Sequence, residues 1–191
     1  MPLSFCIVGV LNIFILFFAP YKKLKKLLLS LGLVFVLLGY FVEPSFFEKS
    51  SINMCILVGV FLSLFSMLIY KSGKSVAKPL LFSFVLVSIY LLVCVKDYNY
   101  LLYFNLYFLT ILINVMSLFV RGIESKFVFV LMAYLLCEIG SFFVVGDRLS
   151  FYPLFSPESL FGVLVPVVFT LFVGGVEKLF IKIKGEVSKN A

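Results

Sequence analysis

The strongest constraint on this chain is a series of long apolar blocks separated by short charged stretches. Each block is about 17 to 22 residues long, enough for a helix to cross the roughly 30 Å hydrocarbon core of a bilayer. Of the 191 residues, 63% are hydrophobic and only 13% are charged, so too few charged side chains exist to coat a soluble core of this size. The sequence therefore predicts an all-α, polytopic integral membrane protein.

The blocks predict a seven-helix bundle that forms one transmembrane domain over residues 1–182, followed by a short basic tail at 183–191. Membrane β-strands are excluded, because they are about ten residues long and alternate polar with apolar residues. The first block lacks a preceding basic segment, so we expect a retained helix rather than a cleaved leader. The predicted helices lie near residues 3–19, 27–42, 52–70, 79–95, 100–120, 127–145 and 160–181.

The basic residues predict how the chain sits in the membrane. Seven helices with the N-terminus outside place thirteen of the sixteen Lys and Arg residues on one side of the bilayer. Basic loops stay in the cytoplasm during insertion, so this pattern predicts an N-out, C-in topology. The basic segments hold Lys22, Lys23, Lys25 and Lys26; Lys71, Lys74 and Lys78; Arg121 and Lys126; and Lys178, Lys182, Lys184 and Lys189.

Charge and composition also predict the surroundings of the protein. The net charge of +7 is spread over four segments, which does not favour nucleic acid as a partner. The basic loops suit the plasma membrane of a prokaryote, with the lipid bilayer and other membrane subunits as the expected partners. We expect contact with anionic lipid headgroups from the loop lysines, Lys22, Lys23, Lys25 and Lys26.

The residue types needed for many kinds of catalysis are missing. The chain has no histidine, which excludes Ser–His and Cys–His hydrolases and His-ligated haem and removes most zinc sites. The four cysteines stand singly, without metal or redox spacing, and we read them as buried apolar residues. The sequence does not exclude a disulfide, because Cys6, Cys55 and Cys94 all fall toward the predicted outer half of the bilayer. We expect no metal, no cofactor and no catalytic residues, and so a protein that is not an enzyme.

Glu138 is the main candidate for a functional residue. It falls about eleven residues into the predicted helix at 127–145, near the middle of the bilayer, where ionised acids are costly and usually functional. A proton relay or a cation site is one interpretation, and a protonated structural Glu is the other. The candidate partners in a proton or ion path are Asn12, Asn105, Asn114, Tyr134 and Ser141, although an asparagine in a membrane helix, taken singly, more often joins helices than acts as a ligand.

Small residues and a proline suggest close helix contacts. Gly59 and Ser63 are four residues apart, as in pairs that bring membrane helices together, and they suit either the bundle or a neighbouring subunit. Pro166 removes one backbone hydrogen bond from the last helix, where Gly174 and Gly175 permit bending or packing.

The longest outer segment, from Gly146 to Ser159, is the only predicted loop that can fold back over the bundle.

Residues 121–184 resemble the small membrane subunit of group-four membrane-bound hydrogenases, which is similar to the K subunit of respiratory complex I. In that family a basic residue precedes a helix with Glu-x-Gly, followed by a loop with proline and an acid, and by a last helix. The matching residues are Arg121, Glu138-Ile139-Gly140, Pro153-Leu154 and Glu158. Ile139 replaces the usual Asn, and an acid expected in the last helix is absent. The resemblance implies that Glu138 belongs to a proton path in a larger complex.

Three functional hypotheses follow. The first is a non-catalytic membrane subunit of a proton-translocating or transport complex, with Glu138 as its protonatable group. The second is a scaffold for assembly of the cell envelope, in which Glu138 is structural. The third is a component of a small solute transporter, because such chains have similar size and hydropathy.

Overall fold

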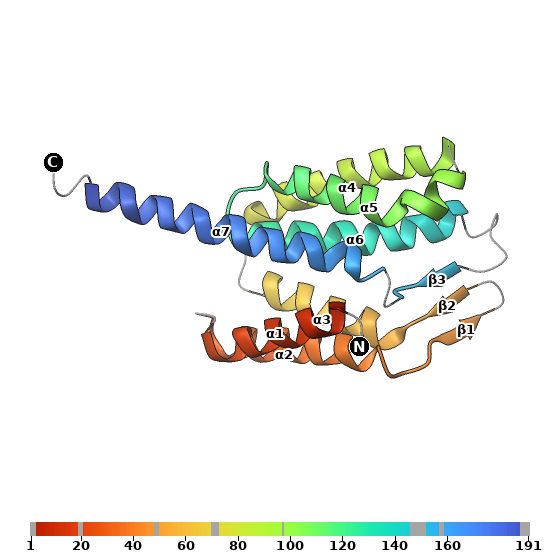
Figure 1. Ribbon diagram of the computed structural model, residues 1–191, viewed down its shortest axis with the longest axis horizontal. Helices are drawn as coiled ribbons and strands as arrows, with labels where there is room; N and C mark the ends of the chain where they lie inside the picture. The colour runs from red at the N-terminus through yellow and green to blue at the C-terminus, as the bar shows by residue number, and fades with distance from the viewer. Residues whose placement is uncertain are drawn as a thin grey trace.

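The computed structural model describes residues 3–18, 21–47, 50–69, 73–96, 98–145, 152–156 and 159–187. Within these ranges the chain forms seven helices that lie roughly side by side, with three short strands at one end (Figure 1). The elements are α1 (Leu3–Phe18), α2 (Lys23–Leu38), β1 (Ser45–Phe47), β2 (Ser50–Ile52), α3 (Met54–Leu68), α4 (Gly73–Lys96), α5 (Tyr98–Ser117), α6 (Ile123–Val145), β3 (Tyr152–Leu154) and α7 (Phe161–Val187). The prediction of a mainly helical chain is confirmed.

Two segments of the described residues are long and apolar enough to cross a bilayer. They are Val76–Val93 in α4 and Ile123–Val144 in α6. Three other apolar helical stretches are shorter, namely Met54–Leu68, Phe108–Ser117 and Gly162–Gly174. The seven crossings predicted from the sequence therefore stay a prediction.

Several helix ends differ from the predicted ones. The helix α2 begins at Lys23 and ends at Leu38, about one turn earlier than predicted, so that lysines occupy its first turn. It ends where Gly39 lies against Ile56, with no room for a side chain at residue 39. At the other end of the chain, α7 continues to Val187, and residues 183–187 are helical instead of forming a separate tail (Figure 1).

The helices α2 and α3 pack with their backbones in close approach. A Cβ atom added at Gly59 would lie 2.5 Å from the Gly32 carbonyl oxygen, and one at Gly32 would lie 2.5 Å from Ser63 Oγ. The Ser63 hydroxyl donates to the Gly59 carbonyl at 2.8 Å and so stays within its own helix. The pair Gly59 and Ser63 therefore serves the internal α2–α3 contact, which the sequence left open.

The three strands form a small sheet in the order β1-β2-β3. The strands β1 and β2 pair antiparallel between α2 and α3, and β3, from the segment between α6 and α7, pairs parallel with β2. Pro153 is tolerated because β3 is an edge strand. The prediction that the segment at 146–159 folds back is confirmed for Tyr152–Leu154, although the sheet itself was not predicted.

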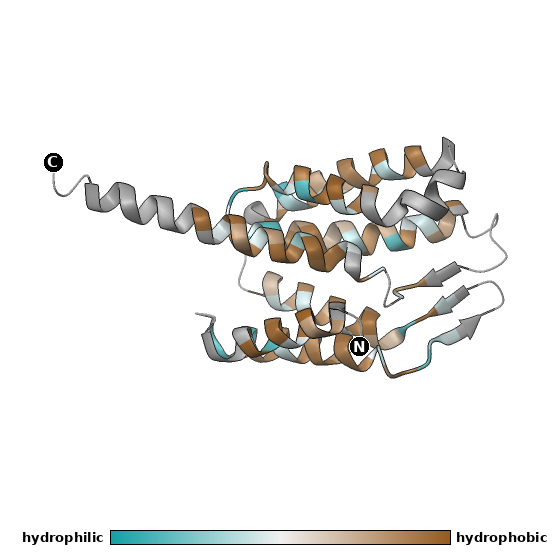
Figure 2. Cartoon of the chain, viewed as in Figure 1, coloured by the Kyte–Doolittle hydropathy of each residue, from teal (hydrophilic) through white to brown (hydrophobic). Residues whose placement is uncertain are grey.

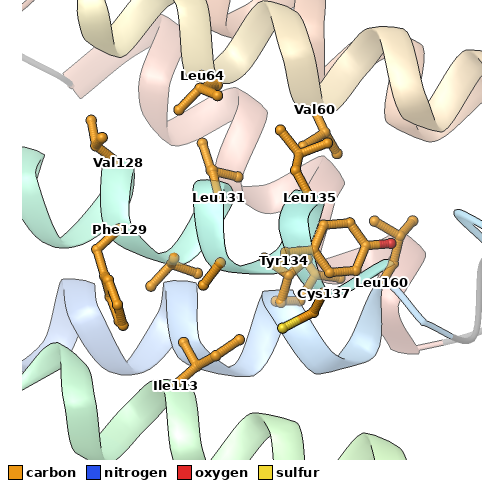
Figure 3. Close-up of a cluster of buried hydrophobic side chains, with 14 of the residues drawn as sticks. Val60, Leu64, Ile113, Val128, Phe129, Leu131, Tyr134, Leu135, Cys137 and Leu160 are labelled. Carbon is orange, nitrogen blue, oxygen red and sulfur yellow. The ribbon is translucent and has the colours of Figure 1, made fainter. Parts of the chain in front are cut away.

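The helix α6 lies at the centre of the apolar core. Leu131 and Leu135 of α6 point toward Val60 and Leu64 of α3 (Figure 3). On the other side of α6, Phe129 and Cys137 point toward α5 and α7, and Ile113 of α5 lies on this side (Figure 3). The helix is therefore covered from several directions, which explains why half of its residues with a described side chain are buried.

Pro166 changes how α5 and α7 pair. Because proline has no N–H, the Gly162 carbonyl, four residues earlier, lacks its helical donor. The Thr110 hydroxyl of α5 donates to that carbonyl at 3.4 Å. Further along α7, Gly174 packs so closely against Ile123 of α6 that a side chain would not fit. Gly175 follows it within α7. These residues fix the position of α7 against α5 and α6.

Candidate functional site

Glu138 is a buried acid that fastens the segment between α6 and α7. This segment, called the returning segment, is described by the structure at residues 152–156 and 159–160. Its residue is 7% exposed, and its Oε2 accepts a hydrogen bond from the backbone N–H of Phe155 at 3.2 Å. The Ser159 side chain lies beside the same carboxylate. Among the residues that the structure describes, no cation forms a salt bridge with Glu138. The salt bridge found there joins Lys25 to Glu124. The acid is thus held by dipoles from the returning segment and not by a cation.

Beside Glu138, the hydroxyl group of Ser159 bonds to that of Tyr134. The Tyr134 and Ser159 hydroxyl oxygens lie 2.8 Å apart, and Ser159 Oγ is also 3.0 Å from the carbonyl of Ser156. Tyr134 is fully buried, whereas Ser156 and Ser159 are partly exposed. A hydroxyl can donate and accept at once, so Ser159 can carry a proton between its neighbours. The chain of groups leads from the buried carboxylate toward the partly exposed returning segment.

Phe155 has an unusual backbone conformation for its residue type. Its φ is +53°, in the left-handed region that non-glycine residues rarely adopt, at a cost of roughly 1–2 kcal/mol. Its side chain is 3% exposed and meets the Tyr134 ring edge-on, with 6.0 Å between ring centroids. Burial of the ring and the bond to Glu138 offset the strain. The returning segment is therefore pinned at both its backbone and its side chain.

The position of Glu138 along its helix differs from the predicted one, while its depth in a bilayer stays a prediction. The helix α6 begins at Ile123, one turn before the predicted start, so Glu138 lies in its last third instead of its middle. The returning segment reaches the same level, because Phe155 contacts the carboxylate directly. Glu138 therefore belongs to the end of the bundle that carries the sheet.

The structure separates Glu138 from the described asparagine candidates. Asn12 accepts a hydrogen bond from the Ser30 hydroxyl at 2.7 Å, which joins α1 to α2. The Asn114 Oδ1 atom is buried and has no hydrogen-bond partner among the described residues. The side chain of Asn105 lies outside the described side chains. Ser141, one turn beyond Glu138, is buried in α6.

The lysines of the first basic loop differ in exposure and in their contacts. Lys22 and Lys23 are exposed and Lys26 is partly buried, which is compatible with contact to lipid headgroups. Lys25 is 5% exposed and forms a salt bridge with Glu124, so the prediction that it contacts headgroups is wrong. Its position on the inner face of the first turn of α2 turns it toward α6.

The returning segment supplies the partners that the sequence did not reveal. Phe155, Ser156 and Ser159 hold the site, yet none was a predicted site residue. A signal exists in the sequence, since Ser156 and Ser159 stand before an apolar helix, and Ser156 Oγ accepts from the Ser159 N–H at 3.1 Å. Among the described cysteines, Cys6 and Cys55 are free thiols and Cys137 is buried in α6, and the Cys94 side chain is outside the described ones.

Comparison with known proteins finds no relative of this chain. No protein-family model, curated protein or solved structure matches this chain. The resemblance to the hydrogenase subunit stays a prediction.

Proposed function

We propose that this chain crosses the plasma membrane of a prokaryote seven times, with its N-terminus outside and its C-terminus in the cytoplasm. Large apolar side chains with high exposure support this proposal, among them Phe143 at 74%, Phe172 at 71% and Leu92 at 67%. Figure 2 shows hydrophobic residues along the described parts of the helices. Such exposure is costly in water and favourable in lipid.

Two long-range contacts agree with the proposed topology. Lys25 and Glu124 lie in segments that the charge pattern assigns to the cytoplasm, and they form a salt bridge. The strands β2 and β3 lie in segments assigned to the outside, and they pair with each other. Each contact joins two segments assigned to the same face, as a seven-fold crossing requires.

Within this membrane protein, we propose a role as a non-catalytic subunit of a proton-translocating or transport complex. The observation that carries the proposal is the buried carboxylate of Glu138, which lies beside the bonded hydroxyl groups of Tyr134 and Ser159 and next to a partly exposed segment. Glu138 exchanges its proton with the outer side when that segment moves away. Tyr134 and Ser159 orient the carboxylate and carry the proton over the first step.

The test is proton flux in vesicles. The full chain is purified in mild detergent with whatever complex accompanies it, reconstituted into vesicles, and followed with an internal pH-sensitive dye. Glu138→Gln keeps the shape of the side chain, removes the exchangeable proton, and is expected to abolish coupled flux. Glu43→Gln, at an exposed position, is the matched control and should leave flux unchanged. Unaltered flux in Glu138→Gln would remove the proposal.

A scaffold for envelope assembly is the second candidate. It is favoured by the local nature of the contacts, because the described hydrogen-bond partner of Glu138, Phe155, comes from the segment that directly follows α6. In that case Glu138 only holds the outer end of the bundle closed. Envelope-synthesis proteins in the purified complex, with normal flux in Glu138→Gln, would favour the scaffold.

A further inference from the structure

The helices fall into two groups. The helices α1, α2 and α3 pack mainly on one another, and α4, α5, α6 and α7 form the second group (Figure 1). Between the groups, the main helix contacts are those of α3 with α6 and of α1 with α7, and they are less extensive than the contacts of α2 with α3 or of α4 with α6. The helices of the two groups are therefore packed less extensively across the boundary than α2 on α3 or α4 on α6.

At one end of this boundary, backbone hydrogen bonds join the groups. The strand β2 precedes α3, and it pairs with β3, which follows α6. The N–H of Asn53, the capping residue of α3, donates to the carbonyl of Leu154 at 3.3 Å. These bonds hold the two groups together without depending on any charge.

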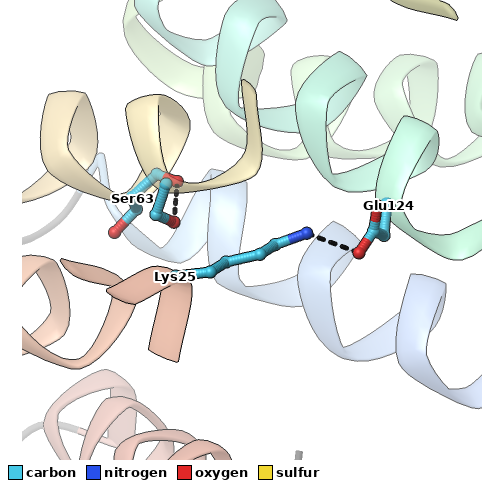
Figure 4. A network of polar contacts seen from close by, with 4 residues as sticks. Lys25, Ser63 and Glu124 are labelled. Atoms are coloured by element: carbon cyan, nitrogen blue, oxygen red, sulfur yellow. Dashed lines mark hydrogen bonds and ion pairs between the residues drawn. The ribbon is translucent and has the colours of Figure 1, made fainter. Parts of the chain in front are cut away.

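At the opposite end, where the chain also passes from α3 to α4, an ion pair joins the groups. Lys25 in the first turn of α2 reaches Glu124 in the first turn of α6, with 2.5 Å between Nζ and Oε1 (Figure 4). The side chain of Lys25 is 6% exposed, whereas that of Glu124 is 41% exposed. The lysine is thus enclosed at the boundary, and the carboxylate lies at its rim.

While the boundary is closed, the Glu124 carboxylate compensates the charge of Lys25. Its Nζ lies 4.5 Å from the centre of the Tyr21 ring. Burial first, and the Glu124 carboxylate second, raise the pKa of Tyr21 above 10.0, so the phenol is neutral and cannot replace Glu124. Breaking a buried ion pair leaves an uncompensated charge, which is strongly unfavourable unless water reaches it. Loss of Glu124 therefore favours opening of the boundary at this end.

We propose that the two helix groups move as bodies about the small sheet, and that the Lys25–Glu124 pair closes the boundary at the far end. The sheet acts as the hinge, because its bonds are backbone bonds and persist as the groups separate. The pair acts as the closure, because water can replace it once the groups part. This proposal concerns the motion alone and stands whether or not Glu138 carries protons.

Thiol labelling of the purified full chain tests the motion. Leu64 of α3 is 6% exposed and points toward α6 on the side of the closure (Figure 3). Leu64→Cys is labelled with a maleimide, and mass spectrometry reads each cysteine separately. Adding Glu124→Gln is expected to raise the labelling rate at residue 64 about tenfold, the change that ~1.4 kcal/mol of closing free energy produces. An unchanged rate would overturn the proposal.

Native cysteines provide the controls. Cys137 is 1% exposed inside the second group, and it should stay protected when the groups part as bodies. Cys6 is exposed and should label quickly in every variant. The charge-reversed combination of Lys25→Glu with Glu124→Lys is expected to restore slow labelling at residue 64. Faster labelling of Cys137 in step with residue 64, or fast labelling that persists in the reversed pair, would show loosening of the whole fold and contradict the proposal.

Discussion

Replacing Gly59 with alanine tests whether α2 and α3 are held by backbone contact. The new Cβ would lie 2.5 Å from the Gly32 carbonyl oxygen, 2.7 Å from Val36 Cγ2 and 2.8 Å from the Val36 nitrogen. Non-bonded carbon atoms prefer separations of about 3.5 Å or more, so the two helices have to part by roughly 1 Å. Overpacking of this kind costs about 1–3 kcal/mol. For a chain of this length, the melting temperature should fall by roughly 2–12 °C.

The assay is thermal unfolding of the full chain in mild detergent, followed by far-UV circular dichroism. Gly9→Ala is the matched control, because Gly9 also lies in a helix and a Cβ there meets nothing within 4 Å. That variant should melt no lower than the parent, since alanine favours helix over glycine. Gly32→Ala should behave like Gly59→Ala, because its Cβ meets the Gly59 carbonyl oxygen at 2.7 Å. Equal melting temperatures for Gly59→Ala and Gly9→Ala would refute the close backbone packing.

Three further outcomes are expected. Asn53→Ala removes two hydrogen bonds of the Asn53 side chain, the α3 cap from the Ile56 N–H at 3.2 Å and the bond to the Gly39 carbonyl at 2.7 Å. In thermal unfolding, the variant should lose about 2–3 kcal/mol of unfolding free energy. Tyr134→Phe removes the bond to Ser159, should cost about 1 kcal/mol, and should speed hydrogen exchange at the returning segment, as mass spectrometry of its peptides would detect. Reporter tags on the two chain ends should lie in opposite compartments, and tags in the same compartment would contradict the seven crossings.

The helices were predictable because their signal is local. Each apolar block reaches helical length by itself, so all seven helices appear where the sequence placed them, with shifts of up to six residues at their ends. The shifts have local causes that hydropathy does not contain. Lys25 and Lys26 lie inside α2, because the first turn of a helix can be basic when one lysine is paired with another helix.

The sheet and the partners of Glu138 were not predictable in the same way. The strands have three residues each, too few for a periodic pattern, and β3 gains its partner from a segment about a hundred residues earlier. Phe155 meets Glu138 through its backbone N–H, a group that every residue except proline carries. Side-chain chemistry therefore pointed to asparagines, whereas the structure uses the main chain.

The pairing of β2 with β3 constrains the order of events during synthesis. Ile52 and Leu154 are partners in the ladder, so the ribosome adds about a hundred residues between them, which takes on the order of 5–20 s. Throughout that interval the edge of β2 that will bind β3 has unsatisfied backbone groups and can pair with another nascent chain. Any shortened product that ends before Tyr152 keeps this edge open permanently and should be prone to aggregation and degradation.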